Sequence, residues 1–241
     1  MAFGDGRRIR WDQNSDLIFR DNPNLARPGE ERRPDLEWIG YFKGQRIYNT
    51  NDAARRRWVW NLDFRAEPGE VFLSAGEIRA GRRFGRRFVV IEPYVPSWKS
   101  VAPNKDWGAQ RYQAVVDRLA ADGLTVLQFL YDKGGPALRG AHGVRTAGFR
   151  DALAILGQAA LFIGPEGGLH HGAAAMGTKG VVLFGGFIPP SVTGYAAHTN
   201  LTGGAEACGS YTPCAHCRVA LDAISVEEVY AAARRQLGMA V

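Results

Sequence analysis

Residues 164–175 combine glycines with side chains suited to binding a ligand. The stretch reads GPEGGLHHGAAA and follows an apolar run at residues 161–163 that is typical of a buried strand. Its glycines at 164, 167 and 168 allow a ligand to approach the backbone closely, because no Cβ intervenes. A helix beginning near His170 would add free N–H groups and a partial positive charge. The sequence therefore predicts an anion site here, suited to a diphosphate.

Two side chains of this stretch extend the prediction from a phosphate to a sugar. Glu166 is expected at the end of the strand, where its carboxylate would accept hydrogen bonds from sugar hydroxyls. His171 falls in the first turn of the helix. A plain glycine turn beside a half-buried histidine is the alternative that spacing alone leaves open. Neither G-x-G-x-x-G nor G-x4-G-K-[ST] occurs, which argues against a dinucleotide-dependent dehydrogenase and against a P-loop enzyme.

The elements that must position this site follow residue 88 in a regular alternation. Apolar runs predict strands at residues 88–91, 125–130, 161–163 and 181–184. Helical spacing of apolar residues predicts helices between Asp106 and Gly123, at 152–156, at 170–176, and from a capping box at Ser225 to about Leu237. Such alternation indicates an α/β domain with a parallel sheet covered by helices on both faces, which binds ligands beyond the carboxyl ends of its strands.

The pattern divides the chain into two parts, residues 1–87 and 88–241. Before residue 88 turn signals predominate, with short strand-like pieces at 58–60 and 71–73. Residues 1–87 hold 18 basic and 13 acidic groups, with an arginine peak at positions 79, 82, 83, 86 and 87, whereas the whole chain has a net charge of +6. This bias indicates an anionic partner, either a phosphate, a nucleic acid or an anionic membrane surface, although a solvated surface would give the same composition.

Composition excludes several classes of protein. Hydrophobic residues make up 46% and charged residues 22% of the 241 residues, which excludes a wholly disordered, collagenous or coiled-coil chain. No apolar run is long enough for a membrane-spanning helix, so we expect at most peripheral membrane contact. The first ten residues carry charges without a following apolar core, unlike a secretory signal, and we expect a cytoplasmic location.

Residues 162–186 resemble the C-terminal half of glycosyltransferase family 9, the heptosyltransferase-like enzymes. The hallmark of that family is Asp-Thr/Ser-Gly-x-x-His, followed by an alanine-rich helix and a strand ending in Phe-Gly. The match places Glu166 at the aspartate, Gly167 at the hydroxyl residue, Gly168 at the glycine and His171 at the histidine. Two positions depart, since Glu166 is one methylene longer and Gly167 lacks a side-chain oxygen, which affects the choice of donor sugar.

A second segment extends the resemblance toward the donor phosphates. The family has a Lys-x-Trp segment before its long helix, and Lys105-Asp106-Trp107 is similar to it. The resemblance implies that Lys105 meets the donor diphosphate, a role that explains a cation at the head of a helix, where it is otherwise unfavourable. Further candidates in the donor site are Ser97 and Lys99 in the same loop and, for a ribose hydroxyl, Asp132.

The resemblance implies a GT-B-like fold with a Rossmann-like C-terminal domain (88–241) and a reduced, basic acceptor-side domain (1–87). It further implies an inverting, metal-independent transfer of a sugar from a nucleotide-diphosphate sugar, without a cofactor, to a hydroxyl group. We expect a cell-envelope saccharide such as that of lipopolysaccharide, or another anionic acceptor. Two alternatives remain, a glycosyltransferase for modified nucleobases in DNA and a non-catalytic protein that binds nucleotide sugars.

The catalytic base is the least defined part of this reading. In the family it is an aspartate in a glycine–aspartate turn after the first strand, and Gly4-Asp5-Gly6 makes Asp5 the match. No buried strand precedes Asp5, so we expect the usual first strand–helix unit to be missing. Other acidic residues of this part of the chain are no better placed: Asp12, Asp16 and Asp21.

Three cysteines form a C-x5-C-x2-C pattern at Cys208, Cys214 and Cys217, with His216 among them. Three thiolates and an imidazole would fill a tetrahedral zinc site. However, His216 adjoins Cys217, an awkward spacing for shared coordination, and no second C-x2-C pair exists. The spacing favours unpaired cysteines and no bound metal.

Overall fold

The computed structural model describes residues 18–26, 29–30, 32–35, 48–85, 87–95, 101–131 and 135–240. Its centre is a six-stranded, wholly parallel sheet in the order β5-β4-β3-β6-β7-β8. The strands are β3 (Val89–Ile91), β4 (Val126–Leu130), β5 (Ala141–Arg145), β6 (Leu161–Pro165), β7 (Gly180–Leu183) and β8 (His198–Leu201). This is the strand order of a Rossmann-type sheet, so the predicted α/β architecture is confirmed.

The order of strands reverses between β3 and β6. From β3 the chain winds outward through β4 and β5, then returns to place β6 on the other side of β3 before adding β7 and β8. In open parallel sheets a crevice forms at such a switch point, outside the carboxyl ends of the strands. The loops after β3 and β6 therefore border the natural ligand site of this fold.

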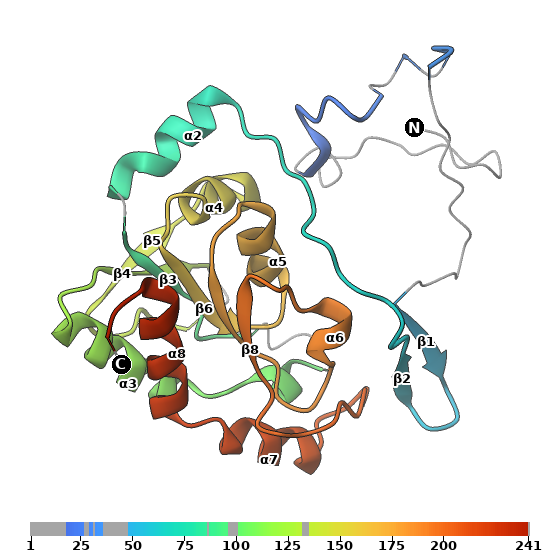
Figure 1. Ribbon diagram of the computed structural model, residues 1–241, viewed down its shortest axis with the longest axis vertical. Coiled ribbons are helices and arrows are strands. Elements are labelled where there is room, and N and C mark those ends of the chain that lie inside the picture. Colours follow the sequence, from blue (N-terminus) through green and yellow to red (C-terminus); the bar gives the residue numbers. More distant parts are fainter. Residues whose placement is uncertain are drawn as a thin grey trace.

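Helices cover both faces of the sheet (Figure 1). Alternate strand residues point to opposite faces, so Val89 and Ile91 pack on one side while Val90 packs on the other. The first face carries α3 (Ala109–Ala121) and α8 (Val226–Leu237). The second face carries α4 (Phe149–Leu156) and α5 (Gly168–Ala175). Both cores consist of aliphatic and aromatic side chains withdrawn from water, which is the main stabilising contribution to this domain.

Local signals set the ends of the helices with one exception. Ser225 caps α8 as predicted, because its Oγ accepts a hydrogen bond from the Glu228 N–H at 3.0 Å. Gly123, with φ of 76°, follows the end of α3 as predicted. Asp106 was expected to cap α3, but the N-cap is Gly108, and Asp106 Oδ1 instead accepts from the Gly108 N–H at 2.9 Å. The aspartate thus closes the turn that precedes the helix.

Three helical segments and two strands escape the sequence patterns. They are α2 (Ala75–Gly81), α6 (Pro190–Thr193), α7 (Ala215–Ala223), β5 and β8. The described residues also form two short 3-10 helices, η1 (Arg82–Phe84) and η2 (Ala102–Lys105), which the sequence patterns did not predict either. None of the helices in the described ranges is long and apolar enough to cross a membrane.

A two-stranded hairpin precedes the sheet domain and is attached to it. Its strands are β1 (Asn49–Asp52) and β2 (Arg57–Trp60), which includes the predicted piece at 58–60. Backbone hydrogen bonds join it to the loop before α7, from Trp58 N to Gly209 O at 2.8 Å and from Tyr211 N to Arg56 O at 3.1 Å. The predicted strand at 71–73 is wrong, since these residues pair with no strand. The division of the chain at residue 88 stays a prediction.

A buried arginine joins α2 to α4. Arg150 on α4 is 3% exposed, and its guanidinium bonds both oxygens of Glu77 on α2 at 2.6 and 2.8 Å. The hydrogen bond from Arg150 lowers the pKa of Glu77 to about 2. The helices meet closely, because a Cβ on Gly81 would lie 2.2 Å from the Ala154 carbonyl oxygen. This charge pair therefore fixes the segment before β3 on the sheet domain.

We predict that Arg150→Ala lowers the free energy of unfolding by about 3 kcal/mol, because it removes the buried one of the two arginines that pair with Glu77. Arg20→Ala is the matched control. Arg20 also contacts Glu77, at 3.1 Å, but its side chain is 44% exposed, and the expected cost is within about 1 kcal/mol. Chemical denaturation measures both. An equal loss of unfolding free energy in the two variants would show that the buried Arg150–Glu77 pair stabilises the fold no more than the exposed contact does.

Candidate active site

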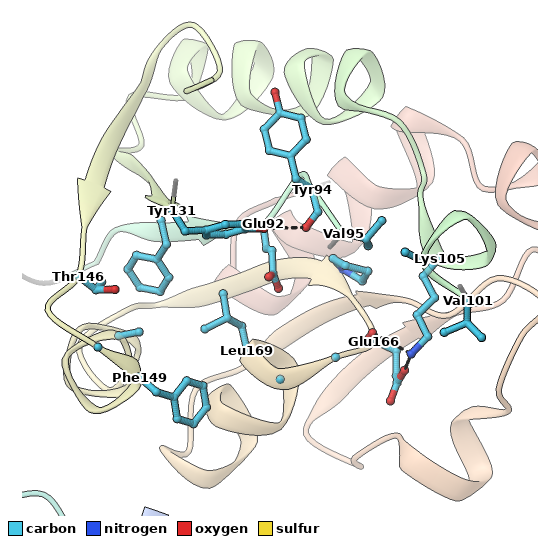
Figure 2. Close-up of a pocket in the computed structure, with 17 residues that line it drawn as sticks. Glu92, Tyr94, Val95, Val101, Lys105, Tyr131, Thr146, Phe149, Glu166 and Leu169 are labelled. Carbon is cyan, nitrogen blue, oxygen red and sulfur yellow. Dashed lines mark hydrogen bonds and ion pairs between the residues drawn. The ribbon is translucent and has the colours of Figure 1, made fainter. Parts of the chain in front are cut away.

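A pocket of ≈ 490 Å³ opens at the carboxyl edge of the sheet, at the switch point between β3 and β6 (Figure 2). Its walls come from the segments that follow four neighbouring strands: Glu92, Tyr94 and Val95 after β3, Tyr131 after β4, Thr146 and Phe149 after β5, and residues 166–169 after β6. The lining is largely apolar and aromatic, and Figure 2 shows polar side chains at Glu92, at Thr146 and, together at one margin, at Lys105 and Glu166. Such a lining suits a ligand with a flat ring system and a charged end.

A chain of polar contacts marks that margin. The Lys105 ammonium, at the end of η2, forms an ion pair with the Glu166 carboxylate and lies 3.4 Å from the Glu166 carbonyl oxygen. His171 Nε2 lies 3.4 Å from Glu166 Oε1, and His171 Nδ1 is 2.8 Å from the Tyr195 hydroxyl. Figure 2 shows Lys105 and Glu166 side by side at one end of the pocket, with the ammonium against the carboxylate. The contacts join η2, the end of β6, α5 and the loop after α6.

The charge on Glu166 is held by its neighbours. The residue is 6% exposed, and burial alone would raise the pKa of its carboxyl group. The Lys105 ammonium and the hydrogen bonds from His171 and Lys105 outweigh burial, so the pKa of Glu166 falls well below its usual range. A buried carboxylate and a nearly buried ammonium thus form a fixed dipole at the mouth of the pocket.

The turn into α5 leaves backbone groups open. No side chain caps the start of this helix at Gly167. A Cβ built on Gly167 or Gly168 would meet no atom of the described residues within 4 Å, so none of these residues fills the space in front of the two glycines. Free N–H groups at a helix start attract anions. The two glycines therefore fit the predicted phosphate cradle.

Two other glycines of this stretch have a different role. A Cβ on Gly164 would lie 2.7 Å from the Phe162 ring and 3.0 Å from Glu92 Cβ. A Cβ on Gly172 would lie 2.5 Å from Leu153 Cδ2 on α4. Both positions need glycine for close packing. Gly164 was expected to border the ligand, but it lies inside the domain.

The structure brings five of the predicted site residues together: Lys105, Glu166, Gly167, Gly168 and His171. Trp107, from the same sequence segment as Lys105, is buried in the core and donates from Nε1 to the Ile224 carbonyl at 2.9 Å, so it is structural. Asp21 lies 3.4 Å from the Arg150 guanidinium, beside α4. The remaining candidates lie outside the described residues, and their roles stay predictions: Asp5, Asp12, Asp16, Ser97, Lys99 and Asp132.

A second pocket, of ≈ 500 Å³, was not predicted from the sequence. It shares Val101, Lys105 and Glu166 with the first pocket, and His171 also lines it. Its remaining walls are mainly aromatic and come from the hairpin and from the loops around α6: Tyr48, Trp58, Trp60, Phe64, Phe187 and Tyr195, with Glu67 as a further carboxylate. We call it the aromatic pocket. Lys105 and Glu166 thus border both pockets.

The uncharged ring of His170 packs between His171, Tyr195 and His198. His170 is fully buried, and neither of its ring nitrogens has a hydrogen-bond partner among the described residues. Its ring lies 4.8 Å from His171, 5.0 Å from Tyr195 and 5.2 Å from His198, between ring centroids. Burial, together with the neighbouring His171, lowers the pKa of His170 to about 3. His170 therefore stays uncharged and packs like an aromatic residue.

This burial predicts a dependence of stability on pH. The pKa of His170 is about 3 in the folded chain against 6.5 for the free side chain, so below pH 6.5 the unfolded chain binds a proton that the folded chain does not. Relative to His170→Phe, the protein should lose about 1.4 kcal/mol of unfolding free energy per pH unit as the pH falls from about 6 to about 4. His142→Ala, at an exposed position, is the control. Parallel stability curves for the protein and for His170→Phe would contradict the assignment.

Comparison with known proteins agrees with the architecture. Residues 74–224, well over half of the chain, match the family model of glycosyltransferase family 9 (heptosyltransferase). A comparison with curated proteins found no match.

Three solved structures share the fold. A glycosyltransferase family 9 protein from Veillonella parvula is 19% identical, with a TM-score of 0.53, over 70% of this chain and 53% of its own. The ADP-heptose lipopolysaccharide heptosyltransferase II of Escherichia coli is 17% identical, with a TM-score of 0.50, over 70% of this chain and 53% of its own. The iron-containing dodecameric glycosyltransferase TibC of enterotoxigenic E. coli is 17% identical, with a TM-score of 0.53, over 71% and 49%.

This chain spans about half the length of the solved structures that it matches. The parallel sheet and the likeness to these enzymes confirm the predicted GT-B-like, Rossmann-like fold for the sheet domain. On the family match, which begins in the residue before α2 and ends just before α8, the chain belongs to glycosyltransferase family 9.

Proposed function

We propose that this chain transfers a sugar from a nucleotide-diphosphate sugar to a hydroxyl group of a saccharide, with inversion at the anomeric carbon. One observation carries the proposal. The Lys105 ammonium and the uncapped start of α5 border the site at the switch point of the sheet, where a carboxylate and a histidine lie beside them. A cation and free N–H groups suit a diphosphate, and a fixed carboxylate suits sugar hydroxyls.

The first pocket suits the nucleoside part of the donor. Phe129, Tyr131 and Phe149 give it flat apolar walls against which a base can stack. Its polar margin at Lys105 is where the phosphates would lie. The predicted ribose contact, Asp132, follows Tyr131 directly in sequence, which supports its place in this proposal.

The reaction needs stabilisation of the departing nucleoside diphosphate. Lys105 is paired with Glu166 in the free protein, and a bound diphosphate would share that ammonium. Fixed donors aimed at developing negative charge lower the barrier without reorganisation. Because Lys105 and the helix start supply this positive charge, we propose that no metal ion takes part in the transfer step. Glu166 and His171 would then hold the sugar itself.

The aromatic pocket is the proposed acceptor side. It meets the first pocket at Lys105 and Glu166, so an acceptor within it would reach the anomeric carbon from the side away from the nucleoside. Attack from that side inverts the configuration. Trp58 and Trp60 offer flat faces for a sugar ring. The positive charge of the N-terminal third favours a phosphorylated or otherwise anionic saccharide, as in a lipopolysaccharide core, and no relative reported above is described as acting on nucleic acid.

A base must remove the proton of the acceptor hydroxyl. The aromatic pocket has two carboxylates among its described residues, Glu166 and Glu67. Glu166 is paired with Lys105 and has a strongly lowered pKa, so it is a weak base. Glu67 is exposed at the rim. We therefore propose Glu67 as a base alongside the family-based candidate Asp5.

The phosphate role of Lys105 predicts a loss of affinity. Lys105→Ala should weaken binding of a nucleoside diphosphate about 10- to 100-fold, since charge-assisted hydrogen bonds to phosphate contribute about 1.5–3 kcal/mol. Lys179→Ala is the matched control, because Lys179 is exposed and donates to the Gln236 carbonyl on α8. Isothermal titration with ADP, GDP and UDP measures the affinities. Unchanged affinity in Lys105→Ala would refute the role.

The base assignment predicts a loss of rate without a loss of donor binding. Glu67→Gln should lower kcat for donor turnover by about 100-fold or more and leave nucleoside diphosphate affinity unchanged. Glu70→Gln, a nearby exposed carboxylate outside the pocket lining, is the control. If neither variant lowers kcat, Glu67 is not the base, and Asp5 stays the candidate for that role. Donor binding without any turnover by the unaltered chain would favour the non-catalytic alternative.

A further inference from the structure

The three cysteines, scattered over ten residues of sequence, converge at one point in the structure. Cys208 Sγ lies 3.3 Å from Cys217 Sγ and 3.6 Å from Cys214 Sγ, and all three sulfurs lie within 4.8 Å of one another. Cys217 is fully buried, whereas Cys208 and Cys214 are half-buried. No disulfide joins them. Three convergent thiols are a set of ligands rather than a pair.

The sulfur spacing fits coordination to one metal ion. A tetrahedral ion with metal–sulfur bonds of about 2.3 Å holds its sulfurs about 3.8 Å apart, close to the separations here. A disulfide needs a sulfur–sulfur distance of about 2.05 Å and would leave the third thiol unused. Soft thiolates select zinc or iron over calcium or magnesium. The geometry therefore favours a metal of that class over a disulfide.

The surroundings also favour ionised sulfur. The Ser210 N–H donates to Cys208 Sγ at 3.5 Å, and such a hydrogen bond favours a thiolate. Cys214 is the N-cap of α7, where the helix dipole stabilises a thiolate. His216 is engaged elsewhere, since its Nε2 is 2.7 Å from the Glu206 carbonyl oxygen. Among the described residues the ligand set is thus these three cysteines, and water or another small ligand can fill the fourth position of a tetrahedral ion.

Residues 208–214, which we call the cysteine loop, connect the two sides of the candidate active site. Buried Asn104, next to Lys105, accepts from the Cys214 N–H at 3.0 Å and donates to the Thr212 carbonyl at 2.9 Å. On its other side the loop holds the hairpin through the Trp58 N–H, which donates to the Gly209 carbonyl at 2.8 Å. An ion that fixes the loop would therefore also fix Lys105 and the wall of the aromatic pocket.

We propose that Cys208, Cys214 and Cys217 bind one thiolate-preferring metal ion, zinc or iron, which fixes the cysteine loop and through it the segment that carries Lys105. The ion has a structural role and takes no part in the transfer step itself. Metal content tests this proposal, and nucleoside diphosphate affinity tests the proposed function. Because the two are measured separately, either proposal can be refuted without the other.

The test is the metal content of the full chain, purified under reducing conditions without a metal-affinity step. Elemental analysis should find about one zinc or iron ion per chain, and it distinguishes the two. Cys217→Ser should contain less than a tenth of this amount. Ser210→Ala is the matched control, because Ser210 lies in the same loop and its hydroxyl bonds the Thr212 carbonyl. Undiminished metal in Cys217→Ser, or a chain free of zinc and iron that also gains no stability from added zinc, would overturn the proposal.

A second measurement covers a variant that fails to fold. Chain stripped of metal by a chelator and titrated with Co²⁺ should develop the near-ultraviolet absorption of thiolate-to-cobalt charge transfer, saturating at about one equivalent. Added Zn²⁺ should abolish the absorption and raise the melting temperature. Absence of this band in folded, reduced chain, or recovery of a Cys208–Cys217 disulfide in its place, would contradict metal coordination.

Discussion

The candidate site depends on one contact, the ion pair between Lys105 and Glu166. A carboxylate that is 6% exposed is stable in its charged form only with a partner, and the ammonium of Lys105 is that partner. The contact joins η2 to the end of β6, across the switch point of the sheet. It therefore determines where the two pockets meet and which groups a ligand encounters between them.

The remaining structure holds this contact in place from three sides. The wholly parallel sheet sets the carboxyl end of β6 beside that of β3. The histidine cluster around His170 supports His171, which contacts the free oxygen of Glu166. Asn104 ties η2 to the cysteine loop. Each support is buried or nearly so, which is what a preorganised site requires.

Much of the sheet domain is readable from the sequence, because buried parallel strands and amphipathic helices leave strong periodic patterns. Lys105, Glu166 and His171 were also found, since they lie beside the best-marked strand and helix ends. Contacts made through tertiary structure left no such pattern. Tyr195 contacts His171 from the loop after α6. Trp58 lines the aromatic pocket because its hairpin is hydrogen-bonded to Gly209, about 150 residues later in the sequence. The spacing of the cysteines argued against a metal, whereas the fold brings their sulfurs together.

The errors have equally local causes. The apolar piece at 71–73 has the composition of a strand, but this segment lies beside α4, where the Phe72 carbonyl accepts from Arg150 instead of pairing in a sheet. Asp106 carries the right side chain for a cap but sits two residues too early, because Gly108, with φ of 100°, makes the turn into α3. Gly164 serves packing, since strand β6 is crowded by Phe162 and Glu92.

The most direct test of the central claim is a structure of the chain with a bound nucleoside diphosphate. We predict that the diphosphate lies against Lys105 and the start of α5, with the base between the aromatic walls of the first pocket. Glu166 should keep its contact with His171, and the Lys105 ammonium should contact both Glu166 and a phosphate oxygen. A diphosphate bound elsewhere, without contact to Lys105 or to the start of α5, would contradict the assignment of this edge of the sheet as the donor site.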